Sequence, residues 1–287
     1  MQIDGHHTLT YIAARLAGFG HNQASIIAYS AQYVDDATNS GTIHFKNGAM
    51  YKRISSAHKM LDYRNTDELA NHQVWIPFHF LPGYALHRLG IAMHVYADTW
   101  SHQGFSGVNH EINEVNDLES NNKKLDRNFF KKIASFFLSE SFPLGHGAAL
   151  SYPDRPDLIW KYKNGLDEPV ERNNPEIFLE AVDKMCRAMK CFRKKDLNMD
   201  LDAVSGLPVG DAKKIYSLLK SIKDHEGEIR HAKWLAEIKN GAFTFGPVSL
   251  FYIAKGKGSW KYKSIGQIAA ADSGREVFPY RKTFLKS

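Results

Sequence analysis

The chain has 287 residues, of which 43% are hydrophobic and 24% are charged, and its formal net charge is +6. This balance is typical of a globular protein and excludes a wholly disordered chain, and no run approaches the roughly 18 apolar residues that a membrane span needs. Two cysteines, Cys186 and Cys191, are too few for disulfide bonds to stabilise a chain of this length. The first residues lack the basic and apolar regions of a secretion signal. We therefore expect a protein of the reducing cytoplasm.

Helical spacing of apolar residues dominates the first hundred residues. It predicts helices over residues 6–18 and 22–35, the first of them ended by Gly18. Residues 43–54 are ambiguous, with a short hairpin around Asn47 and Gly48 as one interpretation. The segment 83–102 is apolar on most sides, so we expect a helix that runs through the core.

The rest of the chain continues this pattern. We expect helices over 126–139 and 175–192, the latter begun by Asn174 and Pro175, and one or two helices over 211–240 with Asp211 as the cap. Residues 248–254 read as a strand. The predicted fold class is mostly α, with a multi-helix domain over 1–240 and a basic C-terminal extension over 241–287.

Positive charge is concentrated at the C-terminal end. Residues 241–287 hold eight basic and two acidic side chains, which equals the whole net charge of +6. Such an end is suited to contact with phosphate or an anionic surface, although a solvated basic end that aids solubility is an equally simple interpretation.

Histidines are concentrated in the first half, where 12 of the 14 lie within residues 1–146. His94, Asp98 and His102 follow one another at helical spacing, which places them at about 0°, 40° and 80° around one helix, about 6 Å apart along it. A carboxylate between two imidazoles is able to bridge two metal ions, and this ligand chemistry suits Zn²⁺. The alternative, a polar stripe satisfied by neighbours, needs many partners in so apolar a helix.

Further ligands must come from other parts of the chain. The candidates are His6 at the start of the first helix, Asp35 and Asp36 at the end of the second, His58 after two serines, and His146 in a loop-like setting. Each of these residues alone is an ordinary surface or capping residue. Together with the three residues of the long helix they form a coherent ligand set.

Two motifs resemble a known superfamily. The opening run from Gly5 to Ala13, with His6, Thr8 and Tyr11, resembles the start of the single-strand-specific zinc nucleases. The His94-x3-Asp98-x3-His102 element resembles the zinc-dependent phospholipase C domain, in particular the branch found in glycosylphosphatidylinositol phospholipase D. The chain also resembles an uncharacterised bacterial family with no assigned activity. The resemblance covers roughly residues 1–160 and implies an all-helical fold with a cluster of zinc ions.

The resemblance also implies roles for individual residues. His6, His58 and His146 match histidine ligands, His94, Asp98 and His102 match the central helix, and Asp98 is the bridge. Asp36, with Asp35 as the alternative, matches the aspartate that ends the second helix. Met1 stands where the family binds zinc through its N-terminal amine. The implied cofactor is two or three Zn²⁺ ions.

The chain departs from the family pattern in two places. The family separates its last aspartate and histidine by more residues than Asp98 and His102. It also places a carboxylate one helical turn after the late histidine, where this chain has Leu150, and Asp154 is the nearest substitute. One metal site is therefore expected to be altered.

The predicted function is zinc-dependent hydrolysis of a phosphodiester, with Asp36 orienting the attacking water and Asp98 balancing the charge of the metals. The substrate is a phospholipid head group or single-stranded nucleic acid, and cleft aromatics such as Tyr33, Phe105 and Tyr152 do not decide between them. Two alternatives stay open. One is a metal-stabilised protein without catalysis, and the other is a module that binds polyanions or membrane surfaces through residues 241–287.

Overall fold

The computed structural model describes residues 1–38, 41–45, 50–53, 86–108, 110–127, 145–196, 198–265 and 277–278. The chain starts with a π-helix, η1 (Asp4–Leu9), that continues into α1 (Thr10–Leu16), and then forms α2 (His21–Asp36) and α5 (Leu86–Ser101). These helices confirm the predicted helices over 6–18, 22–35 and 83–102 to within a few residues. The predicted helix over 126–139 lies almost wholly outside the described residues.

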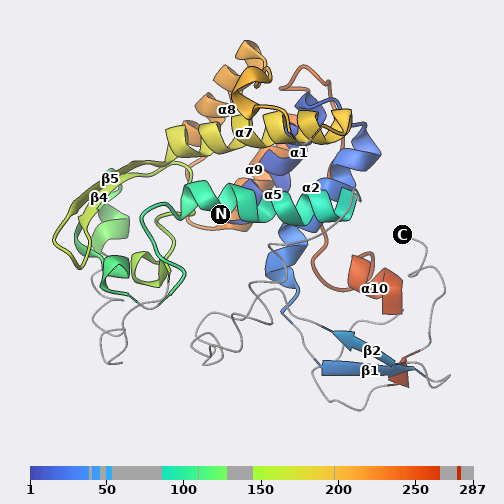
Figure 1. Ribbon diagram of the computed structural model, residues 1–287, viewed down its shortest axis with the longest axis horizontal. Helices are drawn as coiled ribbons and strands as arrows, with labels where there is room; N and C mark the ends of the chain where they lie inside the picture. Colours follow the sequence, from blue (N-terminus) through green and yellow to red (C-terminus); the bar gives the residue numbers. More distant parts are fainter. Residues whose placement is uncertain are drawn as a thin grey trace.

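The second half adds four helices to the described part of the chain. They are α7 (Asn174–Lys194), α8 (Val209–Ser221), α9 (Gly227–Lys239) and α10 (Trp260–Ile265). α7 lies alongside α5, and α9 packs on the N-terminal end of the chain (Figure 1). Asp211 lies in the first turn of α8 and is not its cap, because its carboxylate accepts hydrogen bonds from Thr244.

One hydrophobic core joins these helices. It includes Met93 of α5, Met185 of α7 and Trp234 of α9, all buried. Phe243 and Leu250 belong to the same core, so the beginning of the C-terminal end packs on the helical body. The boundary at residue 240 between a catalytic domain and an extension stays a prediction.

A glycine sets the approach of α2 and α5. A Cβ atom at Gly90 would collide with the backbone carbonyl of Ile27, so only glycine permits the two helices to lie this close. One helical turn further along both helices, His94 of α5 reaches the carbonyl of Ala31 of α2. The close crossing therefore brings the end of α2 beside the polar face of α5.

Two three-stranded sheets overturn the prediction of a mostly α fold, and the described chain is mixed α and β. One sheet has the order β2-β1-β6, with β1 (Gly41–Phe45) antiparallel to β2 (Met50–Arg53) and parallel to β6 (Val277–Phe278). The antiparallel pair confirms the hairpin interpretation of residues 43–54. The other sheet is antiparallel, with β3 (Asn116–Ser120), β4 (Ile159–Lys163) and β5 (Pro169–Asn173).

The β3–β5 sheet forms a lobe beside the end of α5 (Figure 1). It has a small core of its own, in which Trp160, Tyr162 and Leu118 are buried. Three short 3-10 helices, η4 (Glu111–Asn113), η5 (Gly147–Ala149) and η6 (Leu201–Ala203), complete the described elements. The predicted strand over 248–254 is wrong, because this segment runs over the helical body as irregular chain. Within the described residues, no helix combines the length and the apolar character needed to cross a membrane.

Candidate metal centre

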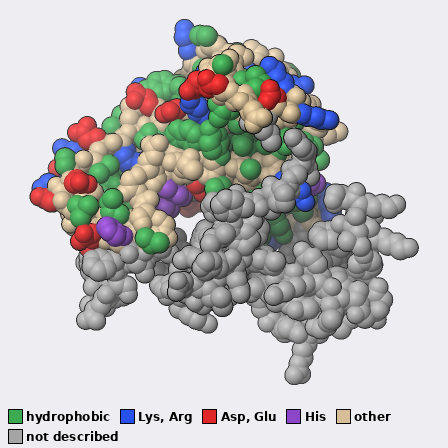
Figure 2. Space-filling view, viewed as in Figure 1, with side chains coloured by type: hydrophobic (Ala, Val, Ile, Leu, Met, Phe, Trp, Pro, Cys, Tyr) green, Lys and Arg blue, Asp and Glu red, His purple; other side chains and the backbone are tan. Residues whose placement is uncertain are grey.

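Two groups of histidine and aspartate lie along the C-terminal half of α5. His6, His94 and Asp98 form the first group, and His102, His146 and Asp154 form the second group. Three of the six residues come from the predicted helical triad, while His6 comes from η1 and the other two from the segment before β4. Figure 2 shows histidine and acidic side chains together on the surface between the helical body and the β3–β5 lobe.

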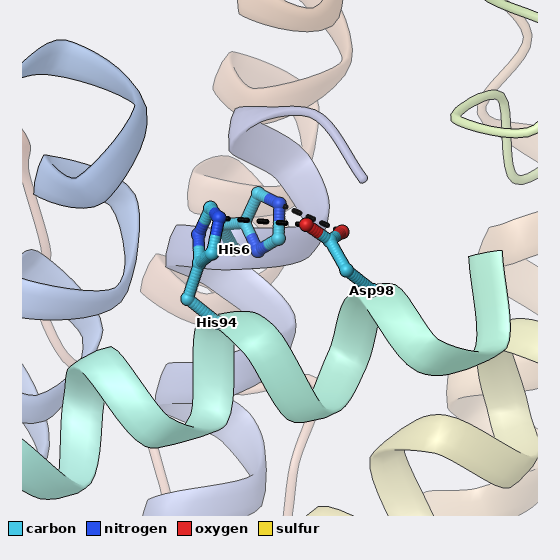
Figure 3. Close-up of side chains that lie close together, drawn as sticks. All are labelled: His6, His94 and Asp98. Carbon is cyan, nitrogen blue, oxygen red and sulfur yellow. Dashed lines mark ion pairs between the residues drawn. The ribbon is translucent and has the colours of Figure 1, made fainter. Parts of the chain in front are cut away.

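The first group converges on the carboxylate of Asp98 (Figure 3). Nε2 of His6 lies 3.3 Å from one oxygen and Nε2 of His94 lies 3.4 Å from the other. The two imidazole rings stack with centroids 3.7 Å apart. Donor atoms that share a tetrahedral zinc ion lie roughly 3.3 Å apart, given bonds of about 2.0 Å. The two distances between imidazole nitrogen and carboxylate oxygen in the first group are close to this value.

His6 is a buried histidine whose Nε2 faces the carboxylates of Asp98 and Asp35. Its side chain is buried, and neither ring nitrogen makes a hydrogen bond with a described residue. A buried polar atom without a partner is costly, and a metal ion would satisfy one of these nitrogens. His6 lies in a π-helix, a rare conformation that is frequent at functional sites.

His94 is oriented through its other nitrogen. Nδ1 donates a hydrogen bond of 2.9 Å to the carbonyl of Ala31, so that Nε2, which faces Asp98, keeps its lone pair. Burial, together with the neighbouring His6, lowers the pKa of His94 to about 4. The ring is therefore neutral at pH 7, as a metal ligand must be.

Asp35, and not Asp36, faces the first group, which corrects the preferred assignment from the sequence. The carboxylate of Asp35 lies 3.7 Å from Nε2 of His94 and 3.9 Å from Nε2 of His6. Asp36 instead accepts a hydrogen bond of 2.6 Å from the hydroxyl of Tyr252. Successive helical side chains point about 100° apart, so only one of the pair is able to face α5.

The second group is organised around Asp154. Its Oδ1 lies 3.3 Å from Nε2 of His102, and its Oδ2 lies 3.9 Å from Nε2 of His146. Nδ1 of His146 donates to the carbonyl of Leu150 at 3.0 Å, which directs Nε2 towards the carboxylate. Asp154 thus lies with His102 and His146 in the described structure, while its role as a substitute for the carboxylate of the family pattern stays a prediction. Leu150 itself has a positive φ of 51°, an uncommon conformation for a residue other than glycine.

The amine of Met1 lies between the two groups. It is 2.5 Å from Oδ1 of Asp98 and 3.1 Å from Oδ1 of Asp154, and Ser101 accepts a further hydrogen bond from it. Burial opposes the charged amine, but the carboxylates of Asp154 and Asp98 outweigh it and raise its pKa to about 11. In return, despite burial, the amine and nearby imidazoles hold the pKa of both carboxyls well below the ordinary value.

His7, the neighbour of His6, is not part of either group. Its Nδ1 lies 2.8 Å from Nε2 of His231, and the pair is buried in the helical body. Burial lowers the pKa of His231 to about 4, so the pair is uncharged at pH 7. His58, the remaining predicted ligand, lies outside the described residues.

Several residues around the groups were not predicted from the sequence. Tyr252 and Ser101 bind the side chains of Asp36 and Asp98, whereas Arg172 and Asn174 bind backbone carbonyls near the second group. Of these residues, only Ser101 could have been predicted from the sequence, because it lies one helical turn after Asp98. Tyr152, proposed as a cleft aromatic, is buried, whereas Phe105 lies against His146 with ring centroids 6.2 Å apart.

Comparison with known proteins gives one match. A family of unknown function, DUF6765, matches residues 1–86 and 83–284. The chain belongs to this family. No curated protein and no solved structure is significantly similar to the chain. The resemblance to zinc nucleases and phospholipases C therefore stays a prediction.

Proposed function

We propose that this DUF6765 protein is a metal-dependent phosphodiester hydrolase whose two His/His/Asp groups hold divalent ions, Zn²⁺ first among them. The observation that carries this proposal is that both groups converge on a carboxylate and lie on either side of one amine. Adjacent metal sites of this kind are common in enzymes that cleave phosphate esters. A third ion would need ligands beyond these two groups.

The donor set fits zinc in its chemistry. Imidazole nitrogens and carboxylate oxygens are ordinary zinc ligands, and the orientation of His94 and His146 by backbone carbonyls is the usual outer support of such ligands. The buried ring of His6, whose nitrogens make no hydrogen bond with a described residue, supports the same conclusion.

The exposure of the ligands favours a catalytic site over a closed structural one. The side chains of His6 and His94 are 1% and 7% exposed, whereas those of His102 and His146 are 30% and 28% exposed. Asp35, at the edge of the first group, is 43% exposed. Catalytic metal sites keep an open position for water or substrate, and structural sites do not.

Each residue has a distinct task in this proposal. Bound metal would act as a Lewis acid that polarises a phosphate oxygen and makes water more acidic. Asp35, exposed and within 4 Å of two ligands, is placed to accept a proton from the attacking water. Asp98 and Asp154 supply negative charge that balances the cations. Phe105, beside His146, is placed to form part of the wall against which the substrate lies.

The test is hydrolysis by the zinc-loaded full chain of bis(p-nitrophenyl) phosphate, phospholipid vesicles and single-stranded DNA. We expect turnover that chelator abolishes and zinc restores. Asp35→Asn should lower turnover while the protein still binds metal. Retained metal with no turnover of any diester would contradict catalysis.

That last outcome would favour a second candidate function, a metal-stabilised protein without catalysis. The nearly complete burial of His6 and His94 favours this role for the first group, because structural metal sites are closed to solvent. Metal would then raise the stability of the fold without accelerating any hydrolysis.

A further inference from the structure

The two groups belong to different parts of the fold. The first group stands on η1 and α5, whose apolar side chains lie in the main helical core. His146 and Asp154 of the second group stand on turns whose neighbours Ala149 and Tyr152 belong to the small core of the β3–β5 lobe. The second group therefore exists only while the lobe is docked on the end of α5.

Arg172 of β5 makes the contact between the lobe and α5. Its guanidinium donates to the carbonyls of Trp100 at 3.1 Å, Ser101 at 2.7 Å and Gln103. These carbonyls are at the C-terminal end of α5, where the last carbonyls of a helix lack their usual partners within the helix and where positive charge is favourable. Because they lie on both sides of His102, Arg172 fixes the backbone that carries this ligand.

Asn174, two residues after Arg172, binds the turn that carries Asp154 of the second group. Its amide nitrogen donates to the carbonyls of Tyr152 and Arg155, each at 2.7 Å. Its side-chain oxygen accepts a hydrogen bond from the indole of Trp160. The two carbonyls flank Asp154, so Asn174 fixes the turn that presents this carboxylate, in the way that Arg172 fixes His102.

We propose that Arg172 and Asn174 form a clamp that completes the second metal group, so that this group takes up metal separately from the first. The inference rests on the metal sites of the proposed function, and it adds an order of assembly to them. Both residues are buried, and neither lies among the ligands. They are positioning residues, and the loss of either one should affect the second group alone.

The experiment titrates the metal-free full chain with Co²⁺, whose visible spectrum reports each site. The variants are Arg172→Met, Asn174→Ala and the conservative Arg172→Lys, with His146→Ala and His94→Ala as references for loss of one group. In Arg172→Met and Asn174→Ala we expect the second cobalt to bind roughly 10–100-fold more weakly, as for other outer-shell partners, while the first binds as in the wild type. Arg172→Lys should recover part of the loss.

Equal weakening of both cobalt ions, or no weakening of either, would overturn the clamp. If Arg172→Met and Asn174→Ala both fail to fold, the two residues stabilise the whole fold and not the second group alone, and the inference is also wrong.

Hydrogen exchange of the metal-free protein tests the clamp without any metal. We expect faster exchange in residues 145–158 of the variants, with protection of η1 and of most of α5 unchanged. If the wild type binds no cobalt, the proposed function is contradicted. The exchange pattern would still show whether Arg172 and Asn174 hold residues 145–158 in place.

Discussion

Oδ1 of Asp154 lies 3.3 Å from Nε2 of His102, although 51 residues separate the two in the chain. This contact ties the end of α5 to the turn before β4. The second group is thus made by the docking of two parts of the fold, whereas two of the three ligands of the first group stand one helical turn apart on α5.

The first prediction concerns metal and stability. His94→Ala and Asp98→Ala should each bind less zinc and lose most of the stabilisation that zinc gives to the wild type. An ion at 100 times its dissociation constant stabilises a fold by about 2.7 kcal/mol. Thermal unfolding with and without chelator measures the difference. His225→Ala, which removes an exposed histidine, is the control and should behave as wild type.

The second prediction separates Asp35 from Asp36. Asp35→Asn should lower hydrolysis at least tenfold, because it removes the carboxylate beside His6 and His94. Asp36→Asn, which removes the charge, and Tyr252→Phe, which removes the hydrogen bond between the two residues, should each have a small effect, since both changes lie outside the metal groups. Turnover of a chromogenic diester by the three variants is the measurement. A larger loss in Asp36→Asn than in Asp35→Asn would restore the assignment made from the sequence.

The third prediction concerns pH. The pKa of His231 is about 4 in the fold because of burial, against 6.5 for an exposed histidine, so the unfolded chain binds more protons between these values. Stability is therefore fully present above pH 6.5 and falls as the pH drops towards 4. Linkage gives a loss on the order of 2 kcal/mol at pH 5 from this residue. Urea unfolding at pH 7 and pH 5 in chelator measures it, and His231→Gln should show a smaller pH effect. An equal effect in both proteins would remove His231 as the cause.

The fourth prediction concerns the basic end. Replacement of four lysines by glutamate (Lys255→Glu, Lys257→Glu, Lys261→Glu and Lys263→Glu) should weaken binding to single-stranded DNA and anionic vesicles. The hydrolysis of a small diester should slow less, because long-range attraction to polyanions depends on this charge and on salt. Charge reversal is preferable to truncation near Gly241, since Phe243 and Leu250 belong to the main core. Unchanged binding to both polyanions at low salt would show that the four lysines have no such role.

The sequence predicted the long helices and most residues of the two His/His/Asp groups for a clear physical reason. Apolar periodicity over 16 to 21 residues, as in α5 and α7, leaves little ambiguity, and ligands that follow that periodicity share a face. His94, Asp98 and His102 were therefore visible as a set. His6 needed the resemblance of the opening motif, because nothing local distinguishes it from His7.

What the sequence could not predict depends on packing between distant segments. The β3–β5 sheet was missed because its strands have five residues each and carry charges such as Lys161 and Lys163. The choice between Asp35 and Asp36 depends on how α2 crosses α5, which Gly90 decides. The strand predicted over 248–254 has suitable residues, but its backbone meets side chains of the helical body, as where Tyr29 donates to the carbonyl of Ile253.

Diffraction from zinc-soaked crystals at the zinc absorption edge would show whether both groups bind zinc. We expect two strong anomalous peaks, one within bonding distance of His6, His94 and Asp98, and the other within bonding distance of His102, His146 and Asp154. Crystals with no peak at either group, or with zinc bound only at other residues, would contradict the proposed metal sites.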